Sequence, residues 1–79
     1  MKVLVVDDHA VVRQGVQRLL SAIPDAVVSE AATAHEALAL ARKENPDVVI
    51  LDINLEGASG LELLRRLRIE NPSIRILMF

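Results

Sequence analysis

The chain has 79 residues, which allows one small domain at most. Its content of 52% hydrophobic and 25% charged residues is typical of a folded protein and excludes an intrinsically disordered one. A net charge of −2 and a single aromatic residue offer no basis for a nucleic-acid surface, and the lack of cysteine excludes disulfides and thiolate metal sites.

The chain begins with a strand pattern followed by a helix pattern. Residues 2–6 form a β-branched run of strand length. Apolar residues then recur at helical spacing up to Pro24 and predict a helix with Arg13 on its polar side. Gly15 inside this helix predicts close packing against a sheet. The predicted core-facing stripe is Val12, Val16, Leu19, Leu20 and Ile23.

A second strand and helix follow. Residues 27–31 are more polar and predict a strand at an edge of the sheet. Thr33 and Glu36 fit a capping box, in which the hydroxyl and the carboxylate accept hydrogen bonds from free backbone N–H groups. The helix ends before Pro46, because the residue that precedes a proline disfavours helical geometry. Its small apolar stripe is Ala34, Ala37, Leu38 and Ala41.

The last third of the chain repeats the alternation. Residues 48–51 are continuously aliphatic, which predicts a strand buried on both faces of a parallel sheet. Ser59 and Glu62 fit a second capping box, the helix after it ends at Pro72, and residues 74–79 predict a fourth strand. The order β-α-β-α-β-α-β predicts the α/β class, with parallel strands and right-handed crossovers.

Three carboxylates stand directly after predicted strands. Asp7 and Asp8 follow the first strand, and Asp52 follows the third. If these strands are neighbours in a parallel sheet, the three side chains converge at one edge, where like charges repel unless a cation lies between them. Mg²⁺ is the simplest such cation, because it takes carboxylate oxygens together with water. The alternative is that Asp7 and Asp8 only cap the following helix.

These acids and their neighbours resemble the receiver domain of bacterial response regulators. The resemblance implies a flavodoxin-like fold, whose strand order in receivers is 2-1-3-4-5. It covers the whole chain, but residues 1–79 correspond only to about the first two-thirds of a receiver domain, so we expect a sheet truncated after its fourth strand. Residues 8–15 are similar to the subfamily with a C-terminal helix-turn-helix DNA-binding domain. The matching segments are Val5-Val6-Asp7-Asp8-His9, Leu51-Asp52-Ile53-Asn54-Leu55 and Gly60-Leu61-Glu62.

The resemblance implies a role for each acid. Asp52 would accept a phosphoryl group from a phosphohistidine of a sensor histidine kinase. Mg²⁺ would be held by Asp8 directly, by Asp7 mostly through water, by Asp52 and by the backbone carbonyl of Asn54. The chain would thus be a signalling protein and not an enzyme, controlling transcription through a DNA-binding domain absent from these residues. Glu56 stands where receivers usually have proline, and the usual hydroxyl and lysine positions after the fourth and fifth strands are not in the chain.

Two other functions stay open. The first is a small phosphatase or phosphotransferase with Asp52 as its nucleophile, although the position of its usual second acid holds Asn54, which cannot supply a proton. The second is an interaction or dimerisation module that is not phosphorylated and binds no Mg²⁺. We give His9 no metal role, because a single histidine in a loop lacks partner ligands. We expect the basic run 65–68 to be a solvated, salt-bridged helix face.

The predicted fourth strand has nothing after it to cover it. An open strand edge pairs readily with another chain, so we expect self-association through this strand, most simply as a two-fold homodimer. The apolar runs are too short to span a membrane, and the first residues do not resemble a signal peptide. We therefore expect a cytoplasmic protein without membrane contact.

Overall fold

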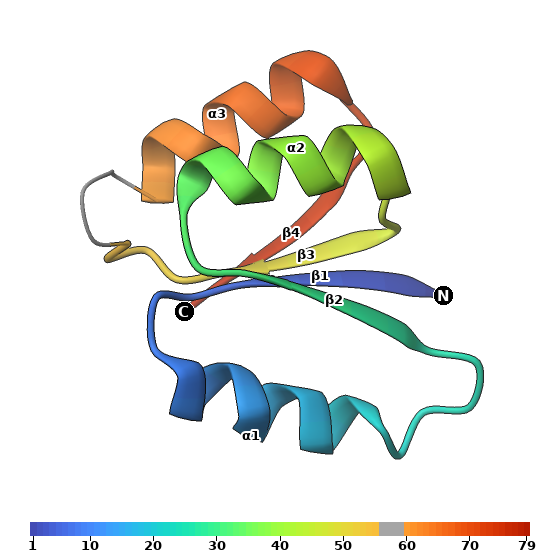
Figure 1. Ribbon diagram of the computed structural model, residues 1–79. Coiled ribbons are helices and arrows are strands. Elements are labelled where there is room, and N and C mark those ends of the chain that lie inside the picture. The colour runs from blue at the N-terminus through green and yellow to red at the C-terminus, as the bar shows by residue number, and fades with distance from the viewer. Residues whose placement is uncertain (56–59) are drawn as a thin grey trace.

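The computed structural model describes residues 1–55 and 60–79, and it has the predicted alternation of strands and helices (Figure 1). The fourth strand spans Arg75–Met78 and is shorter than predicted, since Ile74 and Phe79 lie outside its bounds, although the N–H and the carbonyl of Phe79 still bond to Leu51 and Ile53. The second predicted capping box includes Ser59, which lies outside the described residues. The elements are β1 (Lys2–Val6), α1 (Ala10–Leu20), β2 (Val27–Ala31), α2 (Ala34–Glu44), β3 (Val48–Leu51), α3 (Gly60–Glu70) and β4 (Arg75–Met78).

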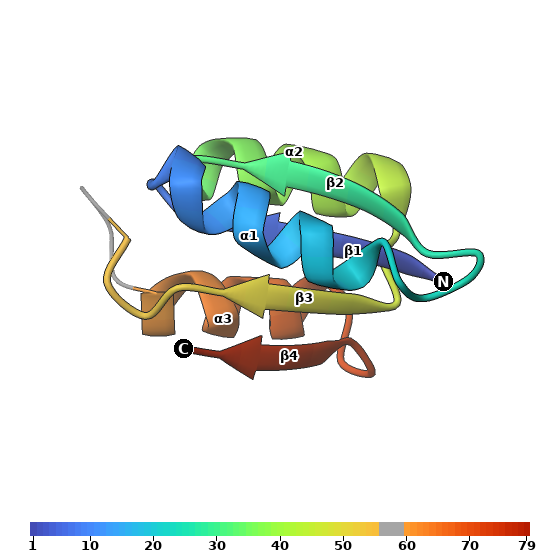
Figure 2. The same ribbon diagram turned by 90° about the horizontal axis from the view of Figure 1, so that it is seen from below.

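The four strands form one parallel sheet in the order β2-β1-β3-β4 (Figure 2). This is the flavodoxin-like order that the resemblance implied, and it places β2 at an edge, as predicted. The register pairs Val6 with both Ala31 and Leu51. Because β1 and β3 are neighbours in register, the residues that follow them emerge side by side at the carboxyl edge of the sheet.

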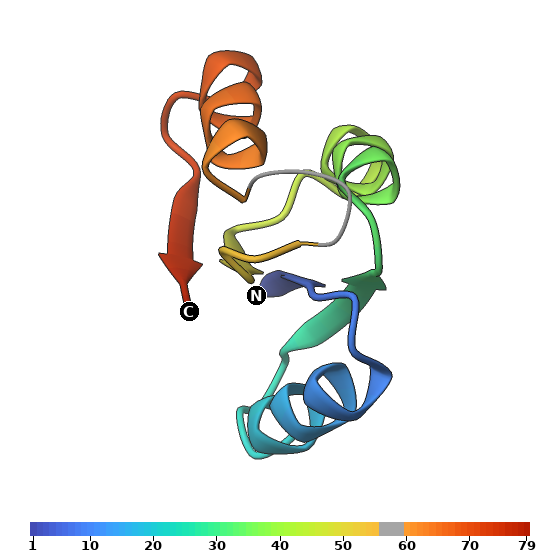
Figure 3. The same ribbon diagram turned by 90° about the vertical axis from the view of Figure 1, so that its left-hand side faces the viewer.

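The helices form two unequal layers. Helices α2 and α3 cover one face of the sheet, and α1 alone lies on the other (Figures 1 and 3). Strand side chains alternate between the faces, and the hydrophobic core lies on the α2/α3 side. Its fully buried members, which anchor the sheet to those helices, are Leu4, Val6, Ala31, Ala37, Val49, Leu51, Leu63 and Leu67.

The face under α1 is covered less than the sequence predicted. No residue of α1 is buried, and Leu19 of the predicted core-facing stripe is 76% exposed. The helical periodicity predicts Arg13 on the polar side, but its side chain is half-buried against the sheet, so the helix is rotated from the predicted orientation. Apart from its chain neighbours and the backbone of its own helix, a Cβ added at Gly15 would have no atom of the described residues within 4 Å, which makes the prediction of close packing there wrong.

The prediction that residues 48–51 are buried on both faces is half wrong. Val49 and Leu51 are inaccessible, whereas Val48 and Ile50 on the α1 side are only half-buried. The reason is that α1 packs over β1 and β2, which leaves β3 and β4 partly open on that face.

Helix α2 begins as predicted, with one correction. The Thr33 hydroxyl accepts a hydrogen bond from the backbone N–H of Glu36 at 3.1 Å, so half of the capping box is confirmed. The Glu36 carboxylate accepts a 3.4 Å hydrogen bond from the Thr33 hydroxyl, and not from a backbone N–H as the capping box predicted. Within the described residues, no helix is long and apolar enough to cross a membrane.

Candidate functional site

The three predicted acids converge at the carboxyl edge of the sheet. Asp7 follows β1 and is 1% exposed, and Asp52 follows β3 and is 9% exposed. One ligand atom from each of Asp7, Asp8, His9 and Asp52 lies within 4.8 Å of the others. The predicted convergence of the carboxylates is therefore confirmed, while the role of each residue stays a prediction.

Backbone hydrogen bonds place the two buried acids. The N–H of Asp7 donates to the carbonyl of Ala31 at 3.1 Å, and the N–H of Asp52 donates to the carbonyl of Val6 at 2.9 Å. Both bonds continue the ladder of the sheet by one residue, so the acids stay in register beyond the strands. Burial of a carboxylate in this way is unfavourable without a compensating partner, which marks these two residues as functional candidates.

Asn54 lies beside Asp52. Its backbone N–H donates to Oδ1 of Asp52 at 2.9 Å, which holds the carboxylate in one orientation. The predicted role of the Asn54 carbonyl as a metal ligand stays a prediction.

His9 contacts two of the acids, which corrects the expectation that it lacks partners. Its Nδ1 lies 2.9 Å from Oδ1 of Asp7 and 2.9 Å from Oδ1 of Asp8. The hydrogen bond to Asp7 and the charge of Asp8 raise the pKa of His9 above its ordinary value. The sequence signal was present, because His9 directly follows the paired acids at the end of a strand. His9 is also the cap residue of α1, so the alternative that Asp7 and Asp8 serve as its caps gains no support.

Arg13 lies behind Asp7 and was missed as a site residue. Its Nη1 donates to the backbone carbonyl of Asp7 at 2.6 Å, and its Nε donates to Glu30 at 3.1 Å. The guanidinium therefore ties the loop after β1 to the edge strand β2. The sequence could not show this contact, because it depends on the rotation of α1.

Gly60 supports the loop that carries Asp52. A Cβ at Gly60 would lie 2.6 Å from the carbonyl oxygen of Asp52 and 2.7 Å from Cα of Ile53. The Gly60 N–H also donates to the carbonyl of Ile53 at 3.1 Å. Only glycine fits this approach, so the start of α3 and the Asp52 loop are fitted to each other.

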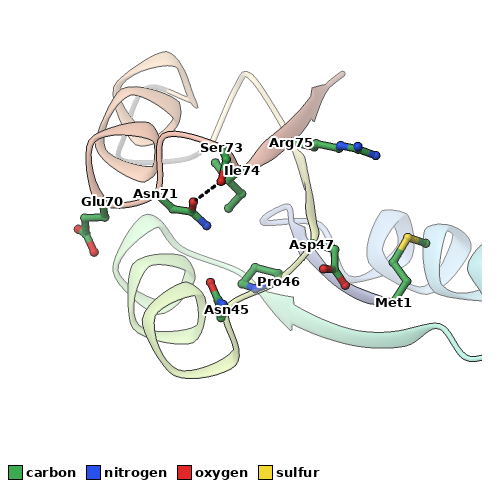
Figure 4. A pocket seen from close by; sticks show the side chains of 9 residues that line it. All are labelled: Met1, Asn45, Pro46, Asp47, Glu70, Asn71, Ser73, Ile74 and Arg75. Atoms are coloured by element: carbon green, nitrogen blue, oxygen red, sulfur yellow. Dashed lines mark hydrogen bonds between the residues drawn. The ribbon is translucent and has the colours of Figure 1, made fainter.

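A cavity of about 780 Å³ lies at the end of the sheet where the strands begin, opposite the converging acids (Figure 4). Ser73 donates to Asn71 across part of its wall at 3.1 Å. The cavity is far from the converging acids, and we assign it no chemistry, because its lining residues form no such cluster. They are Met1, Asn45, Pro46, Asp47, Glu70, Asn71, Ser73, Ile74 and Arg75.

The acid cluster fits a small divalent cation. In an octahedral ion with bonds of about 2.1 Å, two ligand atoms on opposite sides of the ion are about 4.2 Å apart. The ligand atoms of this cluster all lie within 4.8 Å of one another, which is close to that distance. Three carboxylates supply the hard oxygen donors that Mg²⁺ requires.

Comparison with known proteins connects this geometry to a family. Residues 3–79 match the family described as "Response regulator receiver domain". The nitrate/nitrite response regulator protein NarL of Escherichia coli K12 is 42% identical over 78 residues, which are 98% of this chain and 36% of that protein. The response regulator GacA of Pseudomonas aeruginosa is 43% identical over 79 residues, covering 99% and 37%. The chain thus spans a little more than a third of these relatives.

Solved structures give the same result. A two-component response regulator of the LuxR family from Aurantimonas sp. SI85-9A1 matches with a TM-score of 0.91 at 42% identity, over 99% of this chain and 56% of that one. A CheY-like receiver domain protein from Methanospirillum hungatei JF-1 matches with a TM-score of 0.90 at 30% identity, over 98% and 61%.

Proposed function

Because this chain belongs to the response regulator receiver domain family, we propose that Asp52 accepts a phosphoryl group from a phosphohistidine of a sensor kinase. One observation carries the proposal. The buried carboxylates of Asp7 and Asp52, which follow adjacent strands, lie with Asp8 in a cluster of ligand atoms within 4.8 Å.

In this proposal Asp52 is the nucleophile. One carboxylate oxygen forms a bond to phosphorus while the bond from phosphorus to the kinase imidazole nitrogen breaks, and the imidazole leaves. The backbone N–H of Asn54 donates a hydrogen bond to Oδ1 of Asp52 at 2.9 Å. We therefore assign Oδ2 of Asp52 as the candidate attacking atom.

The other acids hold the cation. Asp8 and Asp7, with Asp52 and the backbone carbonyl of Asn54, would bind Mg²⁺, which neutralises charge on the carboxylate and on the phosphoryl oxygens. Burial of Asp7 keeps bulk water away from one side of the site, which strengthens the attraction between these carboxylates and a cation.

The remaining roles concern a longer protein. The relatives named above are response regulators, and this chain spans about a third of each. We propose that residues 1–79 are the N-terminal two-thirds of a receiver domain in a cytoplasmic regulator that controls transcription through a separate DNA-binding domain. Family membership favours this function over an aspartate-nucleophile phosphatase, whose second acid would stand at Asn54.

Phosphorylation by acetyl phosphate and Mg²⁺ tests the proposal. A chain extended by the rest of a receiver domain should gain the mass of one phosphoryl group, and Asp52→Asn should abolish the gain. The 79-residue chain should be labelled poorly, because it lacks the lysine that would neutralise the phosphoryl group. Asp25→Asn is the matched control, because Asp25 is an exposed acid with φ 67°, a conformation that asparagine tolerates. Labelling that survives Asp52→Asn would overturn the assignment. An extended chain that takes up no phosphoryl group and binds no Mg²⁺ would favour the interaction module.

A further inference from the structure

The imidazole of His9 lies between two of the proposed metal ligands. We propose that His9 Nδ1 is itself a ligand of the cation held by Asp7, Asp8 and Asp52, and that it strengthens the site's preference for first-row transition ions over Mg²⁺. This inference rests on the metal site of the proposed function. It adds a nitrogen donor, and with it a selectivity, to a site otherwise made of oxygen.

The first support is the spacing of the donor atoms. Two adjacent ligands of an octahedral ion with bonds of about 2.1 Å are about 3.0 Å apart. His9 Nδ1 lies 2.9 Å from Oδ1 of Asp7 and 2.9 Å from Oδ1 of Asp8. The ring nitrogen is thus one octahedral edge away from each carboxylate, and all the donor atoms stay within 4.8 Å of one another.

The second support is the backbone that carries the ring. The N–H of His9 donates to Oδ1 of Asp7 at 2.7 Å, and the carbonyl of His9 accepts the N–H of Arg13 at 3.1 Å. The residue is therefore fixed on both sides, with extended dihedral angles at the start of α1. The side chain is 66% exposed, yet Nδ1 faces the acids, so binding a cation requires loss of the Nδ1 proton but no change in the backbone that carries the ring.

The third support is the chemistry of the donors. Imidazole is a borderline-soft ligand that adds little for Mg²⁺ and much for ions late in the first transition row. The imidazole should therefore widen the preference for Ni²⁺ over Mg²⁺ beyond that of the three carboxylates alone, with a smaller gain for Mn²⁺.

A counter-ion role for His9 would use the same contacts and predicts the opposite effect on metal affinity. If the His9 ring only serves as a positive counter-ion to the acids, an incoming cation must displace it. Removal of the ring would then strengthen the binding of every divalent ion. If His9 is instead a ligand, its removal would weaken the binding of transition ions and leave the affinity for Mg²⁺ almost unchanged.

Calorimetric titration of Mg²⁺, Mn²⁺ and Ni²⁺ separates the two at about pH 8, where few protons compete for the nitrogen. In His9→Ala we expect affinity to fall about tenfold or more for Ni²⁺, by less for Mn²⁺, and by no more than about twofold for Mg²⁺. His35→Ala is the matched control, because His35 is the chain's other histidine, exposed in the first turn of α2, and its loss should change nothing. Circular dichroism confirms that each variant is folded.

Two further measurements make the test specific. Pulsed electron paramagnetic resonance of bound Mn²⁺ should show a coupled nitrogen in the wild type that His9→Ala removes. Asp8→Asn should weaken Ni²⁺ binding as well, because the ion needs the histidine and the acids together. Tighter binding of all three ions by His9→Ala, or nitrogen coupling that persists in it, would overturn this inference alone. Wild-type protein that binds no divalent ion would overturn both this inference and the proposed metal site.

Discussion

Replacement of Gly60 by alanine should destabilise the protein and displace the loop that carries Asp52. The added Cβ would lie 2.6 Å from the Asp52 carbonyl oxygen, 2.7 Å from Cα of Ile53 and 2.8 Å from the Ile53 carbonyl oxygen. All three atoms belong to the backbone, so no flexible side chain can move aside. Either α3 or the Asp52 loop must shift.

The magnitude follows from this overlap. Forcing an extra carbon into a packed position costs about 1–3 kcal/mol, and three backbone contacts place Gly60 at the upper end, near 3 kcal/mol. The higher helix propensity of alanine offsets at most about 1 kcal/mol of this steric cost, because Gly60 is the first residue of the helix. The expected net loss is about 2 kcal/mol, or roughly 10 °C in Tm for a domain of this size.

Gly15 provides a matched control within the same chain. It lies in the middle of α1, and a Cβ there meets nothing within 4 Å among the described residues. Gly15→Ala should therefore stabilise the protein by about 0.5–1 kcal/mol, because it lowers the entropy of the unfolded chain and favours the helix. The two glycine-to-alanine changes should have opposite signs.

Urea unfolding followed by far-ultraviolet circular dichroism measures both variants, since the chain has no tryptophan or tyrosine for fluorescence. Gly60→Ala should also weaken metal binding, because Asp52 moves with its loop. A Gly60→Ala protein as stable as the wild type would refute the reasoning. So would a Gly15→Ala protein that loses stability, since α1 would then pack more closely than the structure shows.

Three other results are expected. Thr33→Ala should lower the free energy of unfolding by about 1 kcal/mol through loss of the N-cap bond, while Thr33→Ser should retain it; equal losses in urea unfolding would contradict a capping role. The hydrogen bond from Arg42 lowers the pKa of Glu70 below its ordinary 4.5, so the pair should stabilise the fold above about pH 4.5 and stop doing so as the pH falls through the lower, folded-state pKa. Nuclear magnetic resonance titration should show that pKa rising in Arg42→Ala; an unchanged value would exclude the pair as the cause. Self-association of the 79-residue chain through β4 should decrease in Leu77→Lys, a position 63% exposed, and a sedimentation velocity profile identical to wild type would exclude that edge.

Local patterns in the sequence determined the class and order of the elements. The strand runs, the helical stripes and the prolines each act over a few residues, so they predicted seven elements that the structure confirms. The meeting of Asp7 with Asp52 was also predictable. Acids that directly follow parallel, adjacent strands must emerge at the same edge of the sheet.

Only the tertiary structure decided which face of α1 meets the sheet and which of two glycines is sterically required. Arg13 is directed inward because it can bind the Asp7 carbonyl and Glu30 at once, and those partners come from two other segments. Gly15 and Gly60 look alike in the sequence, yet of these two Gly60 alone lies against another backbone. His9 gains its partners in the same way, because the turn after β1 brings its ring over two carboxylates. Such contacts depend on distances between segments, and periodicity within one segment carries no information about those distances.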